Sequence, residues 1–206
     1  MRRITLGLLA LSTTALIGCS SGHHTAQPSA SASPIVTTLI VGKGDQQLSA
    51  GVYRSPAGFE PPVTITARAG WTSIHRGVDG FDFGLAGTGG AAPSVAVVII
   101  VPPESTAAAA LAAARARAHG KLTPVSTPLL GHNAAGFQVD AGSGSVVKSR
   151  AGTIGLDAPS HGKLRVFGLD SGGKPLLVAI YQPVAADGAL NLLNADVLIS
   201  GIAVAR

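Results

Sequence analysis

The residue with the most distinctive chemistry is Cys19, the only cysteine of the 206-residue chain. A cysteine thiolate is a nucleophile that can be alkylated, oxidised or bound to a metal. A single cysteine cannot form an internal disulfide, and it cannot supply a metal site that needs several thiolates. We therefore look to the residues that immediately precede it, Leu16, Ile17 and Gly18, for the chemistry of this position.

The segment before Cys19 has the pattern of a secretory signal. Arg2 and Arg3 supply the positive start, and the apolar run 4–17 follows. This run is about 14 residues long, whereas a membrane-spanning helix needs about 20. Leu16-Ile17-Gly18-Cys19 resembles the lipobox of bacterial lipoproteins. The resemblance implies cleavage between Gly18 and Cys19 and a diacylglyceryl group on Cys19 Sγ. Whether the new amino terminus also carries an acyl group such as palmitate stays open.

Two alternatives remain for this segment: an ordinary cleaved signal with an incidental cysteine, or a short buried helix. The lipid-anchor interpretation divides the chain into a signal peptide (1–18), a lipidated cysteine with a disordered tether (19–34) and a single domain (35–206). Residues 20–34 lack large apolar groups and cannot offset the entropy of ordering. His23 and His24 are interpreted as solvated tether residues, because a metal site needs further fixed ligands. The anchor places the domain at the cell membrane, on its extracytoplasmic face.

Composition narrows the possible partners. The formal charge is +5, charged residues make up 12% of the chain, and aromatic residues make up 4%. Nucleic-acid binding needs a dense basic patch interleaved with aromatic residues, and the basic residues here are scattered. We therefore expect no nucleic acid partner, and no motif indicates a cofactor. The abundance of glycine and alanine is typical of high-GC genomes and favours an actinobacterial source.

The stretch 168–175 resembles two catalytic motifs without completing either. It matches the start of a phosphate-binding P-loop, but Pro175 occupies the position that needs a serine or threonine. Asp170-Ser171-Gly172-Gly173 also occurs in trypsin-like serine proteases, where a glycine precedes the aspartate; here that residue is Leu169. A polar, glycine-rich loop between two strands explains the same residues, and we predict a hairpin there.

Two other groups of residues carry catalytic or ligating side chains. Asp157, Ser160 and His161 are close in sequence, but a triad needs spatial proximity, and short polar runs between strands are usually turns. His75, Asp79 and Asp82 could form a facial metal set, but we interpret them as solvated residues of a glycine-rich loop. A cryptic triad that uses Ser160 or Ser171 remains as an alternative; it predicts a histidine Nε2 within about 3.2 Å of the serine hydroxyl.

The apolar patterns predict the elements that would position these groups. Residues 95–101 form a continuous aliphatic run, typical of a central strand buried on both faces. Trp71 is interpreted as a core anchor at a turn. The alanine-rich segment 104–119 predicts a helix that is capped by Ser105 or Glu104 and ends at Gly120. The other predicted strands are 35–41, 52–54, 63–68, 81–85, 134–140, 146–154, 164–169 and 175–181. A last helix at 187–199 precedes an extended segment, 200–204.

This order of strands, helix, strands and helix predicts an α+β domain with a mostly antiparallel β-sheet covered by helices. The chain also resembles actinobacterial lipoproteins of the LpqN type, which have a PsbP-like α/β/α sandwich fold. The resemblance rests on Pro62–Thr66 leading to Gly70-Trp71, on Pro102-Pro103 before the helix, and on Leu130–Phe137. It implies a non-enzymatic domain.

The sequence therefore supports a membrane-anchored binding or adaptor domain that has no catalytic residues. Its partner would be another envelope protein, or an apolar molecule held between the sheet and the helices. A secreted serine hydrolase and a structural envelope protein without a ligand are the alternatives.

Overall fold

The computed structural model describes residues 35–86, 93–183 and 188–204. All described elements belong to one compact unit, Pro34–Arg206. The predicted signal peptide, lipobox and tether lie outside the described residues, and so does Asp187, where the last helix is predicted to begin.

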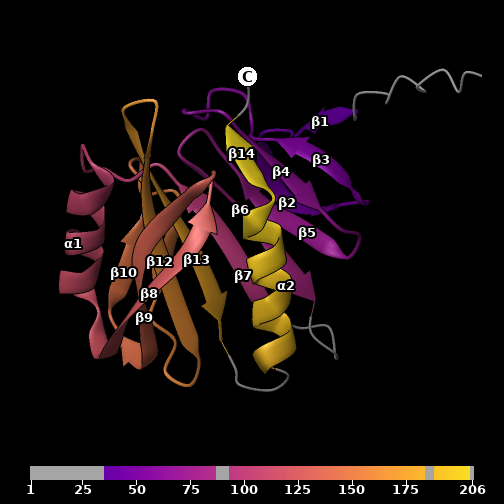
Figure 1. Ribbon diagram of the computed structural model, residues 1–206. Coiled ribbons are helices and arrows are strands. Elements are labelled where there is room, and N and C mark those ends of the chain that lie inside the picture. The colour runs from indigo at the N-terminus through magenta and orange to yellow at the C-terminus, as the bar shows by residue number, and fades with distance from the viewer. Residues whose placement is uncertain (1–34, 87–92, 184–187, 205–206) are drawn as a thin grey trace, which may run out of the picture. The chain divides into compact units, whose positions relative to one another are not determined.

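An antiparallel sheet of eight strands forms the centre of this unit (Figure 1). Its strand order is β2-β5-β6-β7-β13-β12-β9-β8, so consecutive strands are mostly neighbours. The strands are β2 (Gly42–Gln47), β5 (Trp71–Arg76), β6 (Gly80–Ala86), β7 (Pro93–Ile100), β8 (His119–Leu129), β9 (His132–Ser143), β12 (Lys163–Ser171) and β13 (Lys174–Gln182).

Two smaller sheets complete the strands of the described residues. One has four strands in the order β1-β3-β4-β14, and the other is the pair β10-β11. Their strands are β1 (Val36–Thr38), β3 (Gly51–Arg54), β4 (Val63–Ala67), β14 (Ile202–Val204), β10 (Ser145–Lys148) and β11 (Gly155–Asp157).

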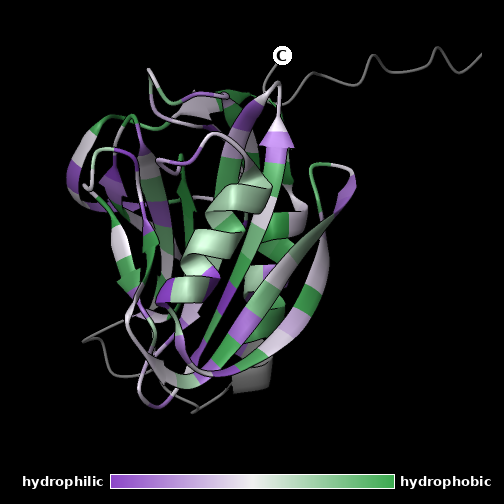
Figure 2. Cartoon of the chain, turned by 90° about the vertical axis from the view of Figure 1, so that its left-hand side faces the viewer, coloured by the Kyte–Doolittle hydropathy of each residue, from purple (hydrophilic) through white to green (hydrophobic). Residues whose placement is uncertain are grey.

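The helices α1 (Ala107–Arg117) and α2 (Gly188–Ser200) lie on opposite faces of the large sheet (Figure 1). Thr106 caps α1, because its hydroxyl accepts a hydrogen bond from Ala109 N. The Asp170 carboxylate accepts a second one from Ala107 N at 2.8 Å, which ties the helix to the end of β12. Figure 2 shows α1 in front of the sheet, pale green over most of its length because most of its residues are alanine.

The small side chains of α1 let it pack unusually close to the sheet. Gly168 of β12 lies directly beneath it: a Cβ atom there would be 2.7 Å from Leu111 Cγ and 3.1 Å from Ala107 O. Ala110 and Ala114 are completely buried in this contact. Alanine and glycine thus replace the larger residues that usually separate a helix from a sheet.

Two hydrophobic cores result, one on each face of the large sheet. The core on the α2 face joins the four-stranded sheet and α2 to the large sheet, and it contains Trp71, Phe81 and Phe83. The core on the α1 face contains Phe137, Val166 and the alanines of α1. Trp71 is buried, as predicted, but it begins strand β5 rather than ending a strand at a turn.

The expectation of an α+β domain whose sheet is covered by helices is wrong, and so is the PsbP-like α/β/α sandwich that the resemblance implied. The described part of the chain is mostly β, with 57% strand and 13% helix. Much of each face of the large sheet is covered by other strands: the β1-β3-β4-β14 sheet on one face and the β10–β11 pair near α1 on the other.

The error came from segments that were read as loops but form strands. They are β2, which lies between the predicted strands 35–41 and 52–54; β5, within the predicted loop that contains His75; and β8, which was not predicted. β2 and β8 are the two edges of the large sheet. An edge strand has only one bonded side, so it can be polar and rich in glycine or proline.

The ends of several predicted elements also moved. The first helix is shorter than 104–119, and Gly120 belongs to β8 with a φ of +136° instead of terminating the helix. The predicted strand 146–154 is confined to β10, and the predicted strand 35–41 to β1. The hairpin between β12 and β13 is confirmed: Gly172 and Gly173 form its turn with φ values of +56° and +75°.

Candidate functional site

The candidate site lies on the α2 face of the large sheet, where strands β8, β9 and β12 extend beyond the helix. The strand register places residues on this face in rows that cross the strands. One row is Val125, Gly136 and Phe167; the next is Thr123, Gln138 and Arg165; the third is Lys121, Asp140 and Lys163. The face thus changes from apolar to charged over three rows.

A cleft of about 440 Å³ opens between these strands and α2. We call it the α2 cleft; it is lined by Val125, Ser126, Thr127, Pro128, Arg165, Phe167, Asp196 and Ser200. Its volume is within the range of small-ligand sites, which is about 300–1,000 Å³. It combines a hydrophobic floor, several hydroxyl groups and one charge of each sign.

The floor of the α2 cleft is fixed by close packing. Phe167 is 2% exposed and belongs to the core, and its ring lies across Gly136 of the neighbouring strand. A Cβ atom at residue 136 would lie 2.7 Å from Phe167 Cδ1. A Cβ atom there would also lie 2.2 Å from Val166 O, so glycine at this position lets the backbone of β12 and the Phe167 ring approach closely. Val125 of β8 pairs with Gly136 from the other side.

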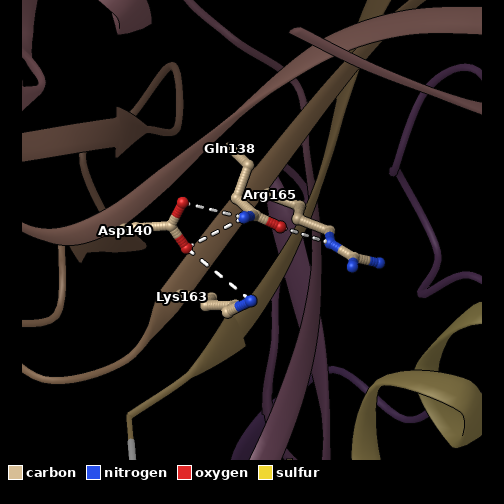
Figure 3. Close-up of polar contacts among 4 residues, drawn as sticks. All are labelled: Gln138, Asp140, Lys163 and Arg165. Carbon is tan, nitrogen blue, oxygen red and sulfur yellow. Dashed lines mark hydrogen bonds and ion pairs between the residues drawn. The ribbon is translucent and has the colours of Figure 1, made fainter. Parts of the chain in front are cut away.

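A polar network continues the floor toward the charged rows (Figure 3). Arg165 Nε donates to Gln138 Oε1 at 2.9 Å. Gln138 Nε2 in turn donates to both Asp140 carboxylate oxygens, at 2.9 and 3.0 Å. Lys163 Nζ lies 3.8 Å from Asp140 Oδ1. Because Gln138 uses both ends of its amide, the network holds the Arg165 side chain in one orientation over the cleft.

Asp196 of α2 faces Arg165 from the opposite wall. Arg165 Nη1 is 3.5 Å from Asp196 Oδ1, which is a loose ion pair. Burial raises the pKa of the Asp196 carboxyl above its ordinary value, while the nearby Arg165 charge opposes that rise. The pair therefore balances charge in the cleft but leaves hydrogen-bonding capacity on both partners: among the described residues, nothing else bonds Arg165 Nη2 or Asp196 Oδ2.

The charged row also reaches a buried amide. Gln182 pairs with Lys163 across β13 and β12 and is 2% exposed. Its Nε2 has no hydrogen-bond partner among the described residues. A buried donor without a partner costs free energy. A polar ligand atom that accepted a hydrogen bond from Gln182 Nε2 would therefore be stabilised at this end of the network.

His75, Asp79 and Asp82, which the sequence analysis weighed as a facial metal set, are not assembled as a site. Asp82 Oδ1 accepts from the backbone N–H groups of Ile74 and His75, at 2.8 and 2.9 Å. Asp79 instead accepts from Ala151 N at 2.9 Å and from Thr153 Oγ1 at 2.5 Å. Its carboxylate ties the turn after β10 to the loop between β5 and β6. Within the described ranges, no group of three or more His, Cys, Asp or Glu side chains could hold a metal.

The serines of the hydrolase alternative have no histidine as a hydrogen-bond partner among the described residues. Ser171 is buried at the end of β12, beside the hairpin turn, and Ser160 is exposed in the loop before that strand. No hydrogen bond joins either hydroxyl to a histidine in the described part of the chain. The string 168–175 is a β-hairpin, so it lacks the helix N-terminus that a P-loop requires.

The cleft residues were missed by the sequence analysis, although a signal was present. Gln138 and Asp140 alternate with buried Phe137 and Val139, and Lys163 and Arg165 alternate with buried Leu164 and Val166. Adjacent strands with polar residues at alternate positions indicate one polar sheet face. Only the pairing of β9 with β12 places the two polar sets side by side.

The comparisons leave the chain without an assigned family. No protein-family model matches it, and no curated protein is similar to it in sequence. No helix in the described ranges is long and apolar enough to cross a membrane.

Proposed function

We propose that this protein is a lipid-anchored, extracytoplasmic binding domain that acts without catalysis and takes its ligand in the α2 cleft. The anchor is the diacylglyceryl group that the Leu16-Ile17-Gly18-Cys19 sequence predicts on Cys19. The observation that carries the binding proposal is the cleft itself: a hydrophobic floor continues directly into a polar network that orients Arg165.

The charges of the cleft restrict the ligand. An anion would be attracted by Arg165 but repelled by Asp196, and a cation would meet the reverse. A neutral polar or zwitterionic group would satisfy both without leaving either charge unpaired. The row that contains Val125 and Phe167 offers contact to an adjoining apolar part. We therefore propose a ligand with a charge-balanced polar group and a short apolar portion.

Native mass spectrometry of the lipidated protein, purified from its own membrane, tests this proposal. We expect a bound molecule or partner on the wild-type protein and its loss in Arg165→Ala and Val125→Glu. The matched controls Arg68→Ala and Val204→Glu change exposed residues outside the cleft and should keep it. A bound envelope protein in place of a small molecule would identify the adaptor form of the proposal. An unliganded wild-type protein would contradict the binding function.

The anchor is tested separately with Cys19→Ser. The wild-type protein should carry the mass of a diacylglyceryl group and partition into a detergent phase. The variant should lose this mass and stay in the aqueous phase. A wild-type protein without the added mass would contradict the anchor and favour an ordinary cleaved signal.

A further inference from the structure

Exposed aliphatic side chains cluster where the described unit begins. Such residues normally lie inside a protein, and a group of them on the surface marks an interaction site. The exposed fractions are 88% for Ile35, 47% for Val36, 73% for Ile40, 52% for Val41 and 55% for Val78. Four of the five lie within the first seven described residues.

Contacts hold these residues at one end of the unit. Arg76 Nε donates to Ile40 O at 2.7 Å, which fixes the segment after β1 against the end of β5. Val78 follows two residues later, and a Cβ atom at Gly58 would lie 3.0 Å from Val78 Cγ1. Gly58 also borders the cavity that Thr38 of β1 lines. The two ends of the cluster therefore meet at the loop 55–62.

Basic side chains surround the aliphatic cluster. Lys43 comes two residues after Val41, and Arg54 pairs with Thr38 across β3 and β1. Arg150 and Lys174 border a second cavity together with Val78. The exposed acids there, Asp45 and Glu60, are fewer, and Glu60 already forms an ion pair with Lys174. Asp79 points inward to Ala151 and Thr153. The surface as a whole is aliphatic and basic.

The position of this aliphatic and basic surface, close in sequence to Cys19, indicates which partner it contacts. Fifteen residues, 20–34, separate Cys19 from Ile35. A chain of that length spans at most about 50 Å even when fully extended. An acyl group on Cys19 would therefore keep this end of the domain within that distance of the bilayer. Aliphatic side chains ringed by lysine and arginine match a layer of anionic phospholipid headgroups above hydrocarbon.

We propose that the surface formed by Ile35, Val36, Ile40, Val41 and Val78, with Lys43, Arg54 and Arg150, docks on an anionic phospholipid membrane. This proposal rests on the proposed lipid anchor, because the anchor supplies the proximity. The docked domain has a defined orientation: β1 and the loop 55–62 face the lipid.

Vesicle co-sedimentation of an unlipidated chain that begins at residue 19 and carries Cys19→Ser tests the surface without the anchor. Both hydrophobic cores lie within residues 34–206, so this chain keeps the complete folded unit. Phosphatidylcholine vesicles are compared with vesicles that also contain phosphatidylglycerol. We expect measurable binding only to the mixed vesicles, and weaker binding as salt increases.

Variants separate this surface from others of similar character. Ile40→Asp should weaken binding about tenfold or more, because it removes an aliphatic group and adds a repelled charge. Arg54→Ala should weaken it roughly fivefold. Leu193→Asp and Arg68→Ala, which alter exposed residues elsewhere, should leave it unchanged.

Three results would overturn the proposal. One is equal binding by Ile40→Asp and wild type; another is equal binding to both kinds of vesicle. The third is a dimer in analytical ultracentrifugation that Ile40→Asp disrupts, since the exposed edge of β1 would then pair with a second copy. Absence of lipid on Cys19 in the native protein would refute the anchor but not the binding of the unlipidated chain, so the two failures are distinguishable.

Discussion

The two faces of strands β9 and β12 differ sharply although the same two segments of the chain build both. Toward α1 these strands present Phe137, Val139, Leu164 and Val166, all with no exposed surface. Toward α2 they present Gln138, Asp140, Lys163 and Arg165. Because the side chains of a strand alternate between its two faces, each strand has one face that is buried against α1 and one face that lies toward the α2 cleft.

The two helices account for the rest of the difference. α1 packs closely on its face of the sheet because it is alanine-rich and contacts Gly168. α2 buries Ala195, Leu198 and Ile199 against the core but turns Asp196 and Ser200 toward the cleft. The comparison shows that a binding surface can be produced by leaving one face of a stable sheet partly uncovered. It also predicts where substitutions will be costly.

The largest effect on stability is expected from Phe137→Ala, on the face that packs against α1. Removing a fully buried phenylalanine should cost about 3–5 kcal/mol, because the tightly packed helix and sheet cannot fill the space. Phe167→Ala should cost clearly less, since the α2 cleft beside it admits water and the Arg165 side chain. Urea unfolding of the Cys19→Ser chain measures both. Equal losses would mean that the two faces are packed alike.

Gly168→Ala tests the close packing between α1 and the sheet. The added Cβ atom would lie 2.7 Å from Leu111 Cγ, so either the helix or the side chain must move. We expect a loss of about 1–3 kcal/mol in the free energy of unfolding. Combining it with Leu111→Ala should recover part of this loss. A neutral Gly168→Ala would show that α1 is more loosely held than its contacts indicate.

Asp79 and Asp196 are carboxylates in opposite situations, and Asp79 contributes to stability. Burial alone would raise the pKa of Asp79, but hydrogen bonds from Ser149, Thr153 and the Ala151 N–H outweigh it and lower the pKa below 3.8. The stability from this group is therefore complete above about pH 4 and is lost as the pH falls through the lower folded-state pKa. Asp79→Asn should cost about 1–3 kcal/mol at neutral pH.

The pH dependence of Asp79→Asn provides the control. Thermal unfolding between acid and neutral pH should show that the difference in Tm between variant and wild type becomes smaller in acid. A gap that is constant with pH would instead indicate a shape effect of the substitution. Asp45→Asn, an exposed residue without a described partner, should leave the stability unchanged.

The smallest effect concerns the titration of Asp196. Burial raises the folded-state pKa of Asp196, because the charged carboxylate is less favourable in the folded protein than in the unfolded chain. The stability that the protonated form contributes at low pH is therefore lost as the pH rises through the folded-state pKa. Arg165→Ala should raise the pKa further, because it removes the opposing positive charge. NMR titration of the Asp196 carboxyl measures this shift. An unchanged midpoint would mean that the 3.5 Å pair does not persist in solution.

Several elements followed directly from local sequence. The aliphatic run 95–101 falls almost entirely within β7 (Pro93–Ile100), a central strand buried on both faces, and Gly172-Gly173 turns the β12–β13 hairpin. The leucine-rich segment near the end of the chain forms α2. These patterns are local because burial on both faces, a turn with positive φ and helical spacing each need only neighbouring residues.

Other elements depended on pairing partners that lie far away in sequence. β8 contains Pro124 and Pro128 and little apolar alternation, and it becomes a strand because β9 bonds one of its sides. β5 was obscured by the polar residues around His75. Without these strands the sheet appeared smaller, and the helices seemed to cover more of it than they do.

By itself, the sequence determined the central strands and the hairpin, because each of these is a local pattern; the signal peptide and the lipobox around Cys19 are predictions from the same kind of pattern. Only the tertiary structure decided that the protein is mostly β and that Arg165 and Asp196 share a cleft. It also gathered Val78 and Ile40 at one end of the unit. Pairing and packing are non-local: they depend on which strand supplies the missing hydrogen bonds and on which face a helix leaves uncovered.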